Sequence, residues 1–384
     1  MLPRSRASSS AMNRELIESN RHFTSGLYQK LLKNEKNNFA LSIFSTQLVL
    51  ALTLAGAKED TATELRTVLH FPEESDPSIF FSQYIKSWKS SNTCRLFAAN
   101  KIYVTKKFVI SEDFKKTAAR DYKVDTESLS FEQNQKAASI INAFVEKQTK
   151  GKMSGTIAPD DLSKDTSVVL VNVSHFRARW LNEFQRASTR MLEFYANGKN
   201  EVLVYMMHQV NNFNYHESRN LKAQFIELPF KDRDVVLVVV LPKERMGLEF
   251  LDQKQEVFRR PAFVEQSVHV VLPKFKIENA RDLVTVLQEM QIRKVFSDEA
   301  NLTGIGGRRN GDLKVDKVVQ KVCFEFDEEG VEASTMETTG KAEERSLHTS
   351  VPVEFIADHP FIFYIKIKDI ICFAGRIMDP SPSS

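Results

Sequence analysis

Residues that could perform chemistry are present, but their spacing does not match common catalytic motifs. The sequence contains no Gly-x-Ser-x-Gly, His-Glu-x-x-His or Walker phosphate-binding motif. Residues 304–311 carry glycines and arginines but lack the spacing of a dinucleotide-binding loop, so a plain turn is expected. His175, His208 and His359 fall in or beside apolar segments, where structural histidines are the default. We therefore expect no enzyme active site.

Candidate metal ligands and disulfides are equally sparse. Cys94, Cys323 and Cys372 are far apart and odd in number, so buried thiols are expected rather than a disulfide framework. The acidic run Asp327-Glu328-Glu329 lacks the spacing of an oxygen-ligand loop, which makes solvated charge or ion pairing its expected role. We predict no metal and no cofactor.

Hydrophobic spacing predicts the elements that must position any functional segment. Helical periodicity appears over residues 13–33 and 135–150, and residues 48–57 are apolar enough for a buried helix. A fully apolar run at residues 167–176 suits a strand in the middle of a sheet. Asn279 is predicted to cap a helix over residues 280–291.

Residues 313–350 stand out because their character changes twice. LKVDKVVQKVCFEF alternates apolar and polar residues with many β-branched side chains, which predicts a strand. DEEGVEAS is acidic and small, and TMETTGKAEERSLHTS is polar without an apolar run, which predicts an exposed loop. A long strand followed by a small-residue hinge and an exposed loop indicates a segment that is cut or that moves.

The same stretch carries a resemblance to a known family. Glu328-Glu329-Gly330-Val331-Glu332-Ala333-Ser334 resembles the hinge of the serpins, which usually has two Glu, Gly, Thr, Glu and several Ala. The resemblance continues in NFALSIFS near the N-terminus, in Asn172, in Trp180 within RARWLNEF, and in CFAGR near the C-terminus. It covers about residues 13–380, and several separated motifs in the right order are more specific than one.

The resemblance implies an α+β serpin fold in one domain. It has a large five-stranded central sheet, two smaller sheets, about nine helices and an exposed reactive-centre loop over about residues 328–350. Residues 1–12, basic and Ser-rich, are expected to form a disordered arm before a single domain over residues 13–380. No enzyme activity is implied.

The implied function is protease inhibition by a suicide mechanism. An endopeptidase attacks the loop, the hinge inserts as a new central strand, and the protease is trapped as an acyl-enzyme. Ser42, Ser45 and Asn172 match the point where the sheet opens, called the shutter, although Ile43 replaces the usual proline. Trp180 matches the top of the sheet, called the breach, where the hinge would enter.

Insertion requires small or apolar residues at alternate hinge positions, because one face of the new strand is buried. Counted from Gly330, that face takes Val331, Ala333, Thr335 and Glu337, while Glu332 and Ser334 face the other side. A buried carboxylate at Glu337 costs several kcal/mol unless it finds a partner. About twenty new ladder hydrogen bonds stabilise the inserted strand by roughly 10–20 kcal/mol. Insertion is therefore still expected to be favourable in free energy, but slower.

We therefore expect an inhibitor that is partly cleaved as a substrate. The alternative is a non-inhibitory serpin acting as a carrier, storage protein or chaperone, whose hinge often carries bulky or charged residues.

Family spacing from Gly330 puts the cleaved bond at Glu344-Arg345 or Arg345-Ser346. Arg345-Ser346 suits a trypsin-like protease, which needs a basic residue before the cut. Glu344-Arg345 suits an enzyme with a basic pocket. A papain-like cysteine protease is a further candidate, because it also forms an acyl intermediate, and Leu347-His348 fits its preference for an apolar residue.

Composition limits the other partners. The net charge of +3 predicts no nucleic-acid or membrane binding, and no apolar run approaches the ~18 residues that span a bilayer. We expect a monomer with at most weak polyanion binding by Lys86, Lys89, Arg95, Lys115, Lys116 and Arg120. The N-terminus lacks the apolar core of a signal peptide, which predicts an intracellular protein, or a secreted one whose signal has been removed. Asn172 and Asn301 begin formal glycosylation sequons.

Overall fold

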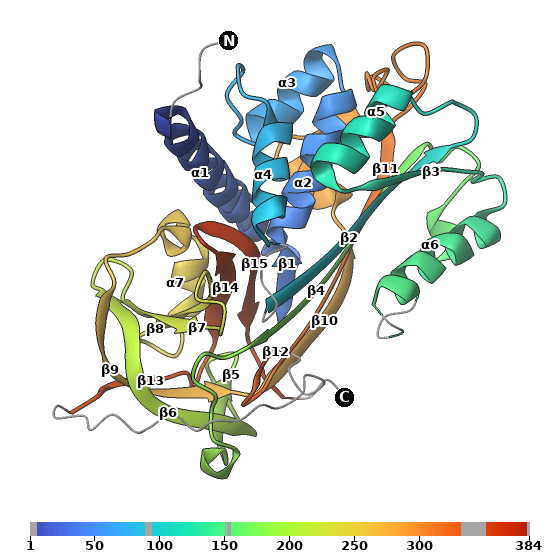
Figure 1. Cartoon of the computed structure of the whole chain (residues 1–384). Helices are drawn as coiled ribbons and strands as arrows, with labels where there is room; N and C mark the ends of the chain where they lie inside the picture. The colour runs from blue at the N-terminus through green and yellow to red at the C-terminus, as the bar shows by residue number, and fades with distance from the viewer. Residues whose placement is uncertain (1–5, 89–93, 150, 152–154, 332–350, 382–384) are drawn as a thin grey trace.

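The computed structural model describes residues 6–88, 94–149, 151, 155–331 and 351–381. The predicted α+β architecture is confirmed: most helices gather at one end of two β-sheets (Figure 1). The α-helices of the described residues are α1 Arg6–Leu31, α2 Ile43–Gly56, α3 Glu59–Val68, α4 Pro77–Trp88, α5 Glu112–Thr117, α6 Asn134–Gln148, α7 Leu248–Asp252 and α8 Val284–Glu289.

The central sheet of the described residues has six strands, one of which is only two residues long. Their order is β10 (Phe275–Asp282), β11 (Val315–Phe326), β12 (Gly330–Val331), β4 (Val168–Arg179), β2 (Cys94–Thr105) and β3 (Asp125–Leu129). β4 and β11 run parallel in the middle. β10 is antiparallel to β11 and β2 is antiparallel to β4, whereas β2 and β3 are parallel. The apolar run predicted to be a mid-sheet strand is therefore β4.

Both faces of the central sheet are covered. Val168, Leu170 and Phe176 of β4 face the main core, while Val169 and Val171 pack under α6 in a second apolar cluster. Burial on both sides explains why β4 reads as a continuous apolar run rather than an alternating one. Figure 1 shows α6 on the side of the sheet opposite α2, so a strand added beside β4 would be buried between two layers.

Nine strands form the other sheet. They are β1 (Phe39–Ser42), β15 (Ile370–Ile377), β14 (Phe361–Ile367), β8 (Val235–Pro242), β7 (Ala223–Pro229), β6 (Asn200–Ser218), β9 (Val264–Pro273) and β13 (Val353–Ile356), with β5 (Arg190–Ala196) paired to β6. The two smaller sheets of the prediction are continuous here. The reason is β6, whose 19 residues pair with β5 toward its start, with β9 through its middle and with β7 toward its end.

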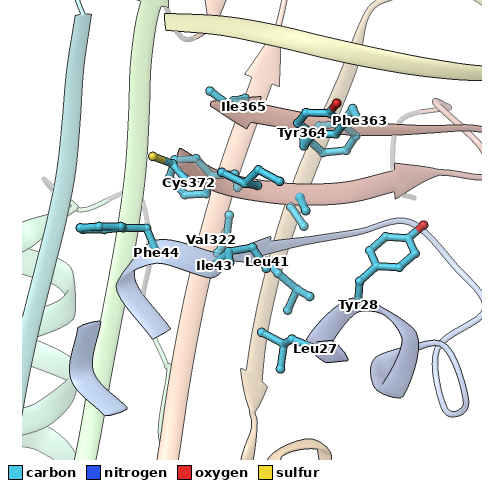
Figure 2. Packing of buried hydrophobic residues seen from close by; sticks show 14 of the residues in the cluster. Leu27, Tyr28, Leu41, Ile43, Phe44, Val322, Phe363, Tyr364, Ile365 and Cys372 are labelled. Carbon is cyan, nitrogen blue, oxygen red and sulfur yellow. The ribbon is translucent and has the colours of Figure 1, made fainter. Parts of the chain in front are cut away.

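The main core lies where the N-terminal helices meet both sheets. Figure 2 shows Leu27 of α1, Ile43 of α2, Val322 of β11 and Phe363 of β14 converging there, and all four are buried. Residues from both ends of the chain thus close over β11. This packing holds β11, one of the two middle strands of the central sheet, in a fixed place.

One prediction stays open and one needs correction. The disordered arm expected over residues 1–12 stays a prediction; α1 begins within that stretch, at Arg6. Asn279 does not cap a helix, because β10 continues to Asp282 with eight residues paired to β11, and α8 starts only at Val284. Its side chain instead bonds the backbone N–H and C=O of Ala40 at 3.0 Å each, joining the two sheets.

Candidate functional site

The candidate site is the seam between the parallel strands β4 and β11. The strands pair from Val168 and Val315 up to His175 and Cys323. Beyond that point β12 lies between them: Val331 pairs with Phe326 of β11 and with Ala178 of β4, and β12 is antiparallel to both. Gly330 and Val331 of the hinge therefore already form the start of a strand between β4 and β11.

Gly330 is required by this geometry. Its φ of +147° lies in a region that side-chain-bearing residues rarely adopt, and an added Cβ would lie 2.0 Å from the Ala178 carbonyl oxygen. Val331, which follows, is fully buried. A residue without a side chain thus lets the backbone approach β4 closely enough to bury the next one.

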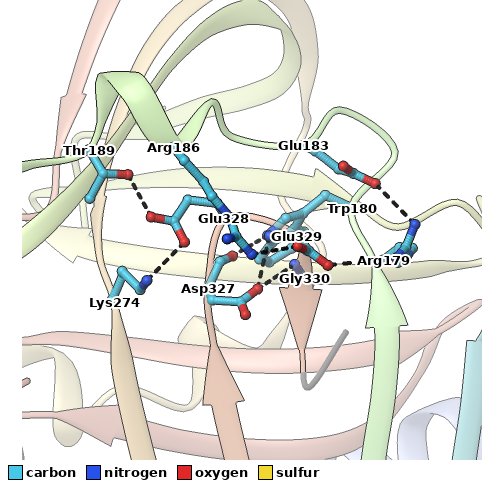
Figure 3. Close-up of polar contacts among 10 residues, drawn as sticks. All are labelled: Arg179, Trp180, Glu183, Arg186, Thr189, Lys274, Asp327, Glu328, Glu329 and Gly330. Carbon is cyan, nitrogen blue, oxygen red and sulfur yellow. Dashed lines mark hydrogen bonds and ion pairs between the residues drawn. The ribbon is translucent and has the colours of Figure 1, made fainter. Parts of the chain in front are cut away.

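Trp180 and Asp327 shape the turn that precedes β12 (Figure 3). The Asp327 carboxylate accepts the N–H groups of Glu329 and Gly330 at 2.9 and 3.0 Å, and Trp180 Nε1 donates to the Asp327 carbonyl at 2.9 Å. Trp180 stacks on Phe230 with centroids 4.5 Å apart. Burial raises the pKa of Asp327, although the two N–H donors oppose that shift.

Glu328 is held by two partners although only 5% of it is exposed. Lys274 Nζ and Thr189 Oγ1 each donate to its carboxylate at 2.8 Å, and its carbonyl accepts the Phe184 N–H at 2.9 Å. Burial by itself would raise the pKa of Glu328, but the bonds from Lys274 and Thr189 outweigh it and lower that pKa. The expected ion-pair role of this acidic residue is confirmed (Figure 3).

Glu329 links the hinge to β4 and to the segment after it. Arg186 Nη2 donates to its carboxylate at 2.6 Å, and Arg179 Nη2 lies 3.6 Å away (Figure 3). The Glu329 carbonyl accepts the Trp180 N–H at 3.0 Å. Both glutamates that precede Gly330 thus anchor the hinge beside the top of β4.

Lower in the seam, the three predicted shutter residues meet. Ser42 Oγ shares a 2.7 Å hydrogen bond with Ser174 Oγ of β4, and Ser174 Oγ lies 3.3 Å from Ser45 Oγ and from Asn172 Oδ1. On the β11 side, Gln320 accepts the Ser42 N–H and donates to the Ser42 carbonyl, both at 3.0 Å. Ser42 is therefore bonded to both β4 and β11.

Sequence reasoning missed Asn100, Ser174 and Gln320. Register places Asn100, Asn172 and Gln320 side by side across β2, β4 and β11, and Asn172 Nδ2 donates to Asn100 Oδ1 at 2.8 Å. The available signal was one amide side chain inside each of the three strands, because a buried amide must have a partner. Only the strand register could show that the three lie in one row.

The remaining predicted site residues lie outside the described residues. They are Glu332, Ala333, Ser334, Thr335 and Glu337 of the hinge, and Glu344, Arg345 and Ser346 of the reactive bond.

Other candidates resolve into structural roles. Three cations of the possible basic face are paired, as Lys115 with Glu112, Lys116 with Asp113 and Arg120 with Asp121. Asn301 is 6% exposed and its amide donates to Glu59 at 3.1 Å, which leaves no room for a glycan in the folded protein. All three cysteines are buried thiols, as predicted.

The described part of the chain has neither a metal-binding cluster nor a membrane-spanning helix. Its residues include no group of three or more His, Cys, Asp or Glu side chains placed to bind a metal ion. None of its helices combines the length and apolarity needed to cross a membrane.

Comparison with known proteins agrees with this fold. Residues 18–380 match the family model described as "Serpin (serine protease inhibitor)". The chain is 33% identical to Serine protease inhibitor 42Dd of Drosophila melanogaster, covering 92% of this chain and 95% of that protein. It is 32% identical to the leukocyte elastase inhibitor of Bos taurus, covering 95% and 100%. The crystal structure of Serpin48, a highly specific serpin of the insect Tenebrio molitor, superposes with a TM-score of 0.87 at 38% identity, covering 95% and 98%.

Proposed function

Because the chain belongs to the serpin family, we propose that it is a protease inhibitor that acts as a suicide substrate. The observation that carries this proposal is β12, which pairs with β4 and β11 at the point where a new strand would start. Relatives whose names describe them as protease inhibitors support the same class of function.

The proposed reaction begins as ordinary proteolysis. A serine or cysteine nucleophile of the target attacks the carbonyl of the bond at 344–345 or 345–346, forms an acyl-enzyme and releases the new amino terminus. The freed hinge then extends β12 between β4 and β11, from Ala178 toward Val168 of β4. The protease stays covalently attached and is carried along before water hydrolyses the ester or thioester.

The seam has the features that this step needs. Eight residue pairs join β4 to β11 in parallel, a pairing that is slightly less stable per residue than an antiparallel one. The inserted strand would be antiparallel to both neighbours, as β12 is, and would replace one ladder by two. Ser42 and Gln320 hold the seam closed until then.

The target class follows from the loop sequence. Arg345-Ser346 favours a trypsin-like serine protease, and a papain-like cysteine protease is the second candidate. Glu344-Arg345 would require a protease with a basic pocket.

The test is to incubate the protein with a trypsin-like, a glutamate-specific and a papain-like protease. A denaturant-resistant complex with one of them establishes the mechanism, and the mass of the released C-terminal peptide identifies the bond. Cleavage without a complex and without a rise in melting temperature refutes inhibition and favours a non-inhibitory role. Arg345→Ala should abolish inhibition of a trypsin-like enzyme; retained inhibition rejects Arg345-Ser346 as the reactive bond.

A further inference from the structure

The hairpin formed by β5 and β6 exposes large apolar side chains on one face. Met191, Leu203 and Tyr205 are 52%, 63% and 58% exposed. Met191 lies directly opposite Tyr205 in the register, and Leu203 is two residues along the same strand face. Single exposed apolar residues are normal on a protein surface, but a contiguous group of this kind marks an interaction surface.

A groove of about 360 Å³ adjoins this face. Its apolar lining consists of Met191, Leu192, Leu203, Met206, Val271 and Ile356. Glu193, Tyr195 and Asp358 also line it, and the described lining residues themselves include no lysine or arginine, although the Arg245 guanidinium stacks on Tyr195 at 3.3 Å from the ring centroid. The groove therefore fits an apolar side chain that is flanked by a basic one.

The groove lies next to the strand that follows the loop. Ile356 of β13 pairs with Val271 of β9, and both line the groove. β13 begins at Val353, seven to nine residues after residues 344–346. A fully extended chain of that length reaches at most about 30 Å. A protease domain of about 230 residues is roughly 45 Å across, so an enzyme holding the loop must extend over this end of the molecule (Figure 1).

We propose that this hairpin face and its groove dock the target protease before the loop is cleaved. The docked element is a surface loop of the enzyme that presents an aliphatic or aromatic side chain beside a lysine or arginine. The inference rests on the proposed function, because it assumes that a protease engages the loop. It adds a determinant of target choice that lies outside the loop sequence.

The experiment uses the protease identified from the panel and the double variant Leu203→Ser/Tyr205→Ser. The measured quantity is the second-order rate constant for consumption of the uncleaved protein, counting both complex and cleaved product. We expect this rate constant to fall at least tenfold, while the ratio of complex to cleaved product stays unchanged, because the seam is untouched. Val109→Ser is the matched control: Val109 is 84% exposed on the loop before α5.

A second variant tests the charge at the groove. Glu193→Gln should also lower the rate constant, and added salt should slow the wild type more than the variant.

The outcomes separate this proposal from the proposed function. A covalent complex that forms at an unchanged rate in the double variant overturns the docking surface and leaves inhibition standing. Slower consumption with no complex in any variant supports docking and overturns inhibition. An equal loss of rate in Val109→Ser, or no cleavage of the loop by any protease, also overturns the docking surface. Melting temperatures within a degree or two of wild type verify that the variants are folded.

Discussion

Gly330→Ala tests whether the start of the inserted strand contributes to the uncleaved protein. The new Cβ would lie 2.0 Å from the Ala178 carbonyl oxygen. Because that oxygen is a backbone atom of β4, no change of side-chain rotamer can relieve the clash. We expect β12 to leave the seam rather than accept this contact. Glu328 and Glu329 would keep their bonds, but Gly330 and Val331 would no longer pair with β4 and β11.

The magnitude follows from what β12 loses. Val331 is fully buried, and exposing a valine costs about 1.5–3 kcal/mol. The bonds of Gly330 to Asp327 add about 1 kcal/mol each, so the free energy of unfolding should fall by about 3–5 kcal/mol. Loss of the pairing of β12 with β4 and β11 should also slow insertion of the hinge. Slower insertion raises the fraction of protein that is cleaved without trapping the protease.

The assay is urea unfolding followed by tryptophan emission, measured in a Trp88→Phe background so that the signal comes from Trp180, which bonds to the carbonyl of Asp327 beside β12. Gly155→Ala is the matched control, because Gly155 also has a positive φ, +62°, but a Cβ there would meet nothing within 4 Å. It isolates backbone strain, which costs about 1–2 kcal/mol. If both variants lose the same stability and keep the same ratio of complex to cleaved product, β12 has no part in insertion.

Two further predictions concern the seam and the breach. Gln320→Leu removes the bonds that join β11 to Ser42, so it should lower the unfolding free energy by about 1–3 kcal/mol. It should also shorten the lifetime of the inhibitory form at 37 °C. Gln253→Leu, at an exposed position, is the control and should change neither quantity. The lowered pKa of Glu328 means that its ionised form stabilises the fold above its ordinary pKa of 4.5, and that this contribution disappears as the pH falls through the lower folded value. The melting temperatures of wild type and Glu328→Gln should therefore differ at pH 7 and converge as the pH falls through the lowered folded pKa of Glu328; a difference that does not change with pH contradicts the linkage.

Much of this fold could be predicted because local pattern and burial agree. β4 is apolar throughout since both its faces are covered, and the acidic residues before Gly330 required partners once they were near a sheet. The helix expected after Asn279 failed for the opposite reason. Pairing with β11 kept that segment extended to Asp282, and no local signal reveals a partner strand some forty residues away.

The site was predictable residue by residue but not as an arrangement. Ser42, Asn172 and Trp180 could be named in advance, whereas the link from Ser42 to both strands depends on Ser174 and Gln320. The apolar face of the β5–β6 hairpin was equally hidden. Its exposed residues look like ordinary strand residues until the register places them together on one face, where they are exposed in the described part of the chain.

The register also changes the expected role of Glu337. Val331 lies opposite Ala178 and Phe326. If the loop continues β12 antiparallel to β4 and β11, each later residue lies opposite the preceding residue of both strands, so that the sixth residue after Val331 lies opposite Asn172 and Gln320. Glu337, six residues on, arrives in the row of amides rather than against apolar side chains. Amide N–H groups are the donors that a buried carboxylate needs.

Glu337 should therefore cost little in the wild type and much once its donors are removed. We expect Glu337→Thr alone to change the ratio of complex to cleaved product less than twofold, but to restore that ratio at least fivefold in a Gln320→Leu background. The double-mutant cycle measures this coupling directly. Additive effects would mean that Glu337 never reaches Gln320, and that the inserted strand does not continue the register that β12 begins.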